Sequence, residues 1–130
     1  VLIESYRPGV TTRLGIDYDT IQAINPGIIY CSLSGFGQSG DEAQRAAYDL
    51  IFQAESGLLH SLNANSPEPA GPQTYLTDST TGVMTAFAIS AALQGRTQNG
   101  GVGRHIDLSM QESVFSLLAV SHGTRQEPND

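Results

Sequence analysis

Cysteine is nearly absent from this chain. Its 130 residues include a single cysteine, Cys31, which excludes an internal disulfide and any metal site built from several cysteines. Cys31 lies in an apolar run, where a free cysteine is typically a small buried side chain rather than a reactive thiol. The histidines His60, His105 and His122 show no spacing typical of metal ligands. We therefore expect no bound metal.

Positive charge is scarce as well. The chain has no lysine, and its six basic residues are all arginines scattered along the sequence, against thirteen acidic residues and a net charge of −7. Because a basic surface is what attracts nucleic acid, we expect no nucleic-acid partner. An anionic small ligand would have to be bound by a few arginines and by backbone N–H groups.

Long hydrophobic runs are missing from both ends of the sequence. No terminal stretch is typical of a signal peptide or of a membrane span, so we expect a soluble, cytoplasmic protein that does not bind membranes. The length and the 39% hydrophobic content suit one domain over residues 1–130, with a frayed polar tail at 122–130. The apolar residues 1–3 have no start signal before them, as if the chain began inside a strand, and we expect a preceding segment.

Strand-like and helix-like segments alternate along the chain. The apolar, β-branched run at 28–33 is typical of a central parallel strand covered on both faces. Asp17 can cap a short helix that ends at residues 25–27, and residues 11–14 can form a helical turn stopped by Gly15. Further helices are expected at residues 46–59, 78–94 and 109–120, and a further strand at 105–108. This order predicts an α/β fold in which helices cover short parallel strands.

The segment Gly35-Phe36-Gly37-Gln38-Ser39-Gly40 matches the G-x-G-x-x-G pattern of dinucleotide-binding proteins. We reject that interpretation, because Asp41 and Glu42 occupy the positions where the phosphate-binding helix would begin. Their charges would repel a pyrophosphate. The segment still follows the carboxyl end of a strand, which is where ligands bind in open α/β sheets.

Asp78 precedes the segment 83–93, which is apolar nearly all round and therefore typical of a buried helix. The local sequence admits two interpretations of Asp78: an ordinary N-cap, or an anionic nucleophile at the N-terminus of the helix. A helix N-terminus favours a carboxylate by roughly 0.3–1 kcal/mol, so we expect Asp78 to be ionised at neutral pH.

Six short motifs follow one another along nearly the whole chain. They are Ile3-Glu4-Ser5-Tyr6-Arg7-Pro8-Gly9, Ile24-Asn25-Pro26, Tyr30-Cys31-Ser32-Leu33-Ser34-Gly35-Phe36-Gly37-Gln38, Tyr48-Asp49-Leu50-Ile51, Asp78-Ser79-Thr80-Thr81-Gly82 and Gly103-Arg104-His105-Ile106-Asp107-Leu108-Ser109. Their order and spacing resemble the class III CoA-transferase family, also called CaiB/BaiF.

The resemblance implies that this chain is an internal part of a Rossmann-like large domain. Members of that family are longer and form interlocked dimers, so we expect a homo-oligomer. The segment before the first motif, the small domain and a glycine-rich loop that closes on the active site would lie outside this chain. The expected ligands are coenzyme A, as acyl-CoA, and a carboxylic acid.

The resemblance also implies catalytic roles for Asp78 and Gln38. In the family, the carboxylate that matches Asp78 attacks an acyl-CoA thioester and then carries CoA as an aspartyl thioester. Gln38 belongs to the loop near the reacting thioester.

Four further residues are expected to contact CoA by the same resemblance. Tyr6 and Arg7 match a segment that lies along CoA, and Arg13 matches a position that can meet its phosphates. Tyr48 stands where the related 2-methylacyl-CoA racemases have a proton-shuttling histidine. A tyrosine with a pKa near about 10 is a poor proton shuttle at neutral pH, which favours CoA transfer over racemisation.

Three alternatives remain open at this point. The chain is part of a CoA-transferase, part of a racemase-type enzyme, or a non-catalytic fragment that folds and self-associates.

Overall fold

The computed structural model describes residues 1–68, 70–71 and 74–123, and for residues 119–123 only the helical backbone. The frayed tail expected at 122–130 lies largely outside these residues. Within them, the α/β prediction is confirmed: three parallel strands are combined with helices.

The sheet has the strand order β1-β2-β3, formed by Leu2–Glu4, Ile29–Ser34 and Arg104–Ser109. The run expected to be the central strand is therefore central, shifted by one residue. Ile29, Tyr30 and Cys31 of β2 are at most 1% exposed, because helices cover both faces of the strand. Cys31 is buried, as predicted.

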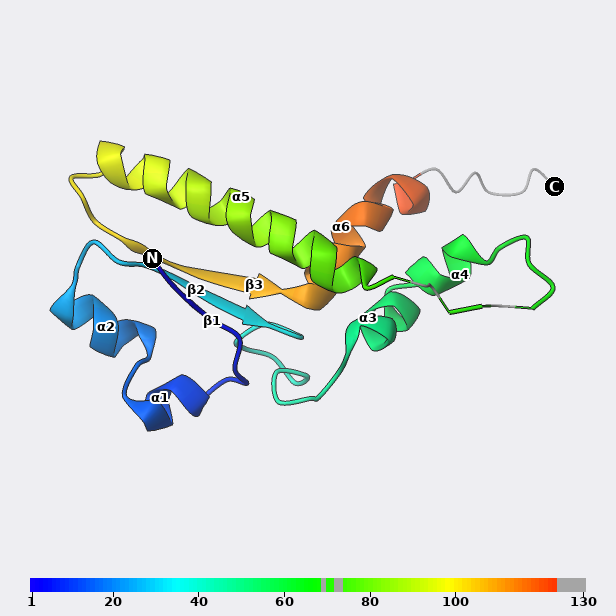
Figure 1. Ribbon diagram of the computed structural model, residues 1–130, viewed down its shortest axis with the longest axis horizontal. Coiled ribbons are helices and arrows are strands. Elements are labelled where there is room, and N and C mark those ends of the chain that lie inside the picture. The colour runs from blue at the N-terminus through cyan, green and yellow to red at the C-terminus, as the bar shows by residue number, and fades with distance from the viewer. Residues whose placement is uncertain (69, 72–73, 124–130) are drawn as a thin grey trace.

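Six helices surround the sheet in the described part of the chain. They are α1 (Val10–Leu14), α2 (Tyr18–Ile24), α3 (Asp49–Glu55), α4 (Leu58–Leu62), α5 (Leu76–Gln98) and α6 (Met110–Gly123). Figure 1 shows α5 along one side of the sheet, α1 and α2 on the other side, and α3, α4 and α6 grouped beyond the carboxyl ends of the strands. None of the helices in these segments has the length and the apolar character needed to cross a membrane.

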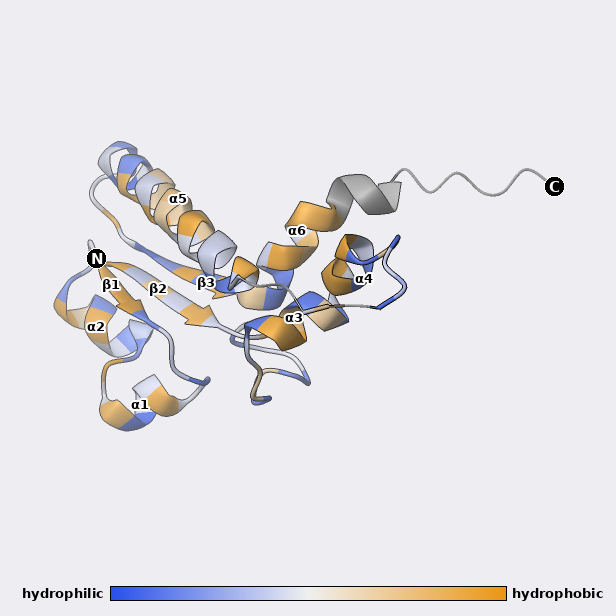
Figure 2. Ribbon diagram, turned by 45° about the vertical axis from the view of Figure 1, so that its right-hand side comes forward, coloured by the Kyte–Doolittle hydropathy of each residue, from blue (hydrophilic) through white to orange (hydrophobic). Residues whose placement is uncertain are grey.

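Two small hydrophobic cores hold these layers together. One joins the sheet to α5 through Ile29, Cys31, Ile89 and Ala92. The other lies beyond the sheet and is formed by Phe52, Leu58, Val114 and Leu118. Figure 2 shows the apolar residues on β1, β2 and α6, whereas the loop after α4 is mostly hydrophilic.

The prediction of one helix over residues 46–59 is wrong about where the helix starts and about its being continuous. It begins only at Asp49 and is divided into α3 and α4 at Gly57, whose φ of 82° is a left-handed conformation that favours glycine. The predictions made from local sequence signals before this region are confirmed. Asp17 caps α2 by accepting a hydrogen bond from the Thr20 N–H at 3.1 Å, and Gly15 ends α1 in a left-handed conformation.

The expectation of a helix buried on all sides is also wrong. The buried residues of α5 follow one stripe, consisting of Thr77, Thr81, Thr85, Ile89 and Ala92. Val83 and Phe87 are 71% and 75% exposed on the remaining surface. The helix also begins before Asp78 and continues through Gly95, where we expected it to end. Val83 and Phe87 therefore leave an apolar part of α5 uncovered, and the homo-oligomer expected from the resemblance stays a prediction.

Candidate active site

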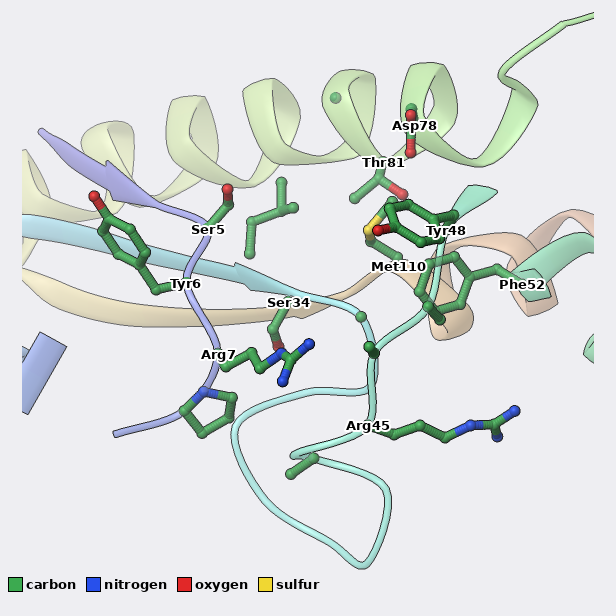
Figure 3. Close-up of a pocket in the computed structure, with 17 residues that line it drawn as sticks. Ser5, Tyr6, Arg7, Ser34, Arg45, Tyr48, Phe52, Asp78, Thr81 and Met110 are labelled. Carbon is green, nitrogen blue, oxygen red and sulfur yellow. The ribbon is translucent and has the colours of Figure 1, made fainter. Parts of the chain in front are cut away.

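A cavity of about 460 Å³ lies at the carboxyl ends of the strands. Its walls come from the segment after β1, the end of β2, the loop before α3, and the first turns of α3, α5 and α6. Figure 3 shows Asp78 and Thr81 on α5 facing Tyr48 and Phe52, with Arg7 on the opposite side of the cavity. This is the end of a parallel sheet where ligands bind in open α/β folds.

Asp78 is the third residue of α5 and not its N-cap, which corrects one of the two interpretations of the sequence. The capping position belongs to Tyr75, whose side chain makes no capping hydrogen bond. The N–H of Asp78 instead donates to the Asp49 Oδ2 atom at 2.9 Å. The Asp78 carboxylate is therefore not used to cap its own helix.

The surroundings raise the pKa of Asp78 above its ordinary value. The larger cause is partial desolvation by the protein around the carboxylate, and the second is the negative charge of Asp49. This direction is opposite to the one expected from the helix N-terminus. It makes the carboxylate more basic than that of a free aspartate.

Four of the six residues expected at the site line this cavity: Tyr6, Arg7, Tyr48 and Asp78. The structure does not bring Arg13 or Gln38 to its wall. Arg13 is exposed in the last turn of α1. The backbone N–H of Gln38 donates to the Asp107 Oδ2 atom at 3.1 Å, so its loop is attached to β3. The roles expected for these two residues stay predictions.

Arg45 also lines the cavity, although no motif or spacing in the sequence pointed to it. Its guanidinium forms ion pairs with Glu42 at 2.9 Å and with Glu55, and it lies over the ring of Phe36. These contacts stabilise the loop before α3 and neutralise the charge. Arg7, by contrast, forms no ion pair with any described residue.

Ser34 was missed as well. It is 6% exposed at the end of β2, it lines the cavity, and its hydroxyl has no hydrogen-bond partner among the described residues. A buried hydroxyl normally has a partner, so this one is available to a ligand. A serine within a strand carries no sequence signal of this kind.

A second cavity, also of about 460 Å³, adjoins the first. Asp49, Leu50 and Tyr75 contribute to its wall, and Tyr48 and Asp78 line both cavities. Asp78 therefore borders two neighbouring cavities. Among residues 1–68, 70–71 and 74–123, no three histidine, cysteine or acidic side chains are grouped so that they could hold a metal ion.

The model of CoA-transferase family III matches residues 1–129. The chain belongs to this family. It is 39% identical over 118 residues to a succinyl-CoA:glutarate CoA-transferase of Mus musculus, covering 91% of this chain and 27% of the relative. It is 42% identical over 119 residues to an acetyl-CoA:oxalate CoA-transferase of Acetobacter aceti, covering 91% of this chain and 30% of the relative.

Solved structures show the same relationship. A CaiB/BaiF family protein from Brucella suis superposes with a TM-score of 0.87 at 33% identity, over 98% of this chain and 34% of that protein. The resemblance read from the six motifs is thereby confirmed. The chain spans about a quarter to a third of the length of these relatives.

Proposed function

We propose that the protein containing this chain transfers CoA from an acyl-CoA to a carboxylic acid, with Asp78 as the nucleophile. The observation that carries this proposal is the position of Asp78, whose side chain lines two adjoining cavities in a chain of CoA-transferase family III. A transferase of this kind has to present one group first to an acyl-CoA and then to an acid. The acids named for the relatives, glutarate and oxalate, define the class of acceptor to test first.

The reaction begins with attack of the Asp78 carboxylate on the thioester carbonyl carbon. The C–S bond breaks, CoA leaves as a thiolate, and a mixed anhydride forms between Asp78 and the acyl group. The thiolate then attacks the Asp78 carbonyl carbon, which releases the first acid and leaves an aspartyl-CoA thioester. The acceptor acid repeats these steps in reverse, so that Asp78 is regenerated as a carboxylate and no water or oxidant is consumed.

The groups around Asp78 support this chemistry. A raised pKa makes a carboxylate a stronger nucleophile, provided that it remains ionised. The guanidinium of Arg7 and the hydroxyl of Ser34, which form no ion pair and no hydrogen bond, respectively, with the described residues, can bind an anionic or polar part of an acyl-CoA. Tyr6 and Tyr48 offer aromatic surface, and each is more than half exposed.

The test is to trap the covalent intermediate. The full-length protein is incubated with an acyl-CoA, the thioester is cleaved with hydroxylamine or borohydride, and the modified residue is located by mass spectrometry after digestion. We expect the modification on Asp78 and its loss in Asp78→Asn, which has nearly the same shape. Asp19→Asn is the matched control, because Asp19 is also an exposed acid in the first turn of a helix but lies outside both cavities. Transfer activity in Asp78→Asn, or trapping on another residue, would refute the proposal.

Racemisation is distinguished by a separate measurement. A racemase removes the α-proton of a 2-methylacyl-CoA, so incubation in deuterated water would introduce deuterium at that carbon. We expect no deuterium there, because the residue beside Asp78 is Tyr48 rather than a histidine. Incorporation that depends on Tyr48 would favour the racemase alternative.

A further inference from the structure

The first turn of α5 is capped by a residue from another helix. A helix begins with backbone N–H groups that have no partner within the helix, and a side chain at the N-cap usually accepts one of them. In α5, the side chain at the N-cap, Tyr75, accepts none. Asp49, the first residue of α3 and 29 positions before Asp78 in the chain, accepts the Asp78 N–H with its Oδ2 atom at 2.9 Å.

Asp49 is held rigidly enough to do this. It is only 7% exposed, and its Oδ1 atom accepts a hydrogen bond from the Gln53 side-chain amide, which is fully buried. Its backbone carbonyl accepts a hydrogen bond from the Thr77 hydroxyl at 3.3 Å, which gives a second link between α3 and α5. Both oxygens of the carboxylate and the carbonyl therefore have partners on the two helices.

We propose that Asp49 is a positioning residue, which caps α5 from α3 and thereby fixes the location of Asp78 and places a negative charge near it. The catalytic consequence rests on the proposed function of Asp78. The structural part, a carboxylate of one helix bound to the first turn of another, rests only on the geometry.

The charge of Asp49 is the negative charge that acts on Asp78 from the walls of the two cavities. The other charged or titratable residues on these walls are Tyr6, Arg7, Arg45, Tyr48 and Tyr75. Arg45 is already paired with two glutamates, and α6 contributes only the neutral Met110. The negative charge of Asp49 is the second cause of the raised pKa of Asp78. Removing this charge should therefore make the ionisation of Asp78 easier.

Two substitutions separate the cap from the charge. Asp49→Asn keeps an oxygen that can accept the Asp78 N–H. Its new amide can donate to Gln53 once the Gln53 side-chain amide turns so that Oε1, which has no partner among the described residues, replaces Nε2 on the side facing residue 49. Asp49→Ala removes both the acceptor and the charge. Asp19→Asn again serves as the control for loss of an exposed acid elsewhere.

The first measurement is the titration of Asp78 in the full-length protein, by ¹³C NMR of labelled aspartate carboxyl carbons. The Asp78 signal is identified as the one that disappears in Asp78→Asn. We expect both Asp49 variants to lower the titration midpoint of Asp78, and Asp19→Asn to leave it unchanged. An unchanged midpoint in Asp49→Asn would overturn the charge part of the proposal.

The second measurement is amide hydrogen exchange of the peptide that contains the first turn of α5. We expect exchange in Asp49→Ala to accelerate by about fivefold, the factor that corresponds to loss of a typical cap. Asp49→Asn should stay close to the parent protein. Unchanged exchange in Asp49→Ala would show that Asp49 does not hold the turn and would overturn the proposal.

The third measurement is the pH dependence of thioester formation. If Asp78 is the nucleophile, the acidic limb of the rate profile should move to lower pH in Asp49→Asn, an effect that a purely structural role would not produce. An unmoved acidic limb would overturn the proposed control of Asp78. If no thioester forms on Asp78 in the parent protein, the proposed function fails, while titration and exchange still decide whether Asp49 positions this residue.

Discussion

The start of β3 offers a sharp test of how the chain is packed, because Gly103 leaves no room for a side chain. A Cβ atom on Gly103 would lie 1.8 Å from the carbonyl oxygen of Ile28 and 2.6 Å from the carbonyl carbon and the nitrogen of the same residue. All three are backbone atoms at the entry to β2. They cannot move aside as the end of a flexible side chain can.

The Gly103→Ala substitution should therefore separate the beginnings of β2 and β3. Overpacking of this kind costs about 1–3 kcal/mol. Two hydrogen bonds lie at the same place, from the Gly103 N–H to the Pro26 carbonyl at 2.8 Å and from the Arg104 N–H to the Ile28 carbonyl at 3.0 Å. If each contributes about 0.5–1.5 kcal/mol, the expected loss of unfolding free energy is about 2–6 kcal/mol. That is a large part of the stability of a typical domain, about 5–15 kcal/mol.

Equilibrium urea unfolding measures this loss, and Gly95→Ala is the matched control. It adds the same methyl group inside α5, where the nearest atom to a new Cβ is Nη2 of Arg104 at 3.9 Å. Replacing a glycine in a helix interior should stabilise the protein by about 1 kcal/mol. A loss below about 1 kcal/mol in Gly103→Ala, or a loss of similar size in Gly95→Ala, would refute the packing described for the start of β3.

Two further predictions concern pH. The hydrogen bond from the Thr20 N–H is the main cause that lowers the pKa of Asp17, so the ionised carboxylate stabilises the fold at neutral pH and this contribution is lost as the pH falls through the lowered pKa. Asp17→Ala should therefore reduce the melting temperature at pH 7 but by much less near pH 2, and an equal reduction at both pH values would contradict this. The raised pKa of Asp78 has the opposite effect on stability, because its contribution is fully present below the unfolded pKa of about 3.9 and is lost as the pH rises through the raised pKa. Asp78→Asn should therefore be at least as stable as the parent protein at pH 7 in thermal unfolding. A clear loss of stability at pH 7 would contradict the desolvated, negatively charged surroundings described for Asp78.

Features that depend on a few neighbouring residues were predicted from the sequence. Asp17 precedes the segment that it caps, and Gly15 ends α1 in the left-handed conformation that glycine adopts at little cost. The run that became β2 is apolar on both faces, which is enough to place it in the centre of a parallel sheet. Each of these signals is local, so no knowledge of distant residues was needed.

The two incorrect helix predictions have different physical causes. Gly57 was visible as a weak position, but the sequence did not show that its left-handed φ divides the segment into α3 and α4, with Leu58 directly after it in one buried cluster with Phe52 and Val114. The apolar composition of α5 suggested burial on every side. Only its contacts with the sheet, α3 and α6 decide that a stripe containing three threonines faces inward while Val83 and Phe87 face outward.

The candidate site divides in the same way. The sequence by itself determined the family, through six ordered motifs, and it selected Asp78, Tyr6, Arg7 and Tyr48, which the fold brings to one cavity. Only the tertiary structure decided that the Asp78 carboxylate does not cap α5. The carboxylate that caps this helix belongs to Asp49, which lies 29 residues away in the chain. Such a contact has no local signal: it arises where two helix N-termini meet beyond the ends of the strands, and the sequence carries no record of which termini meet.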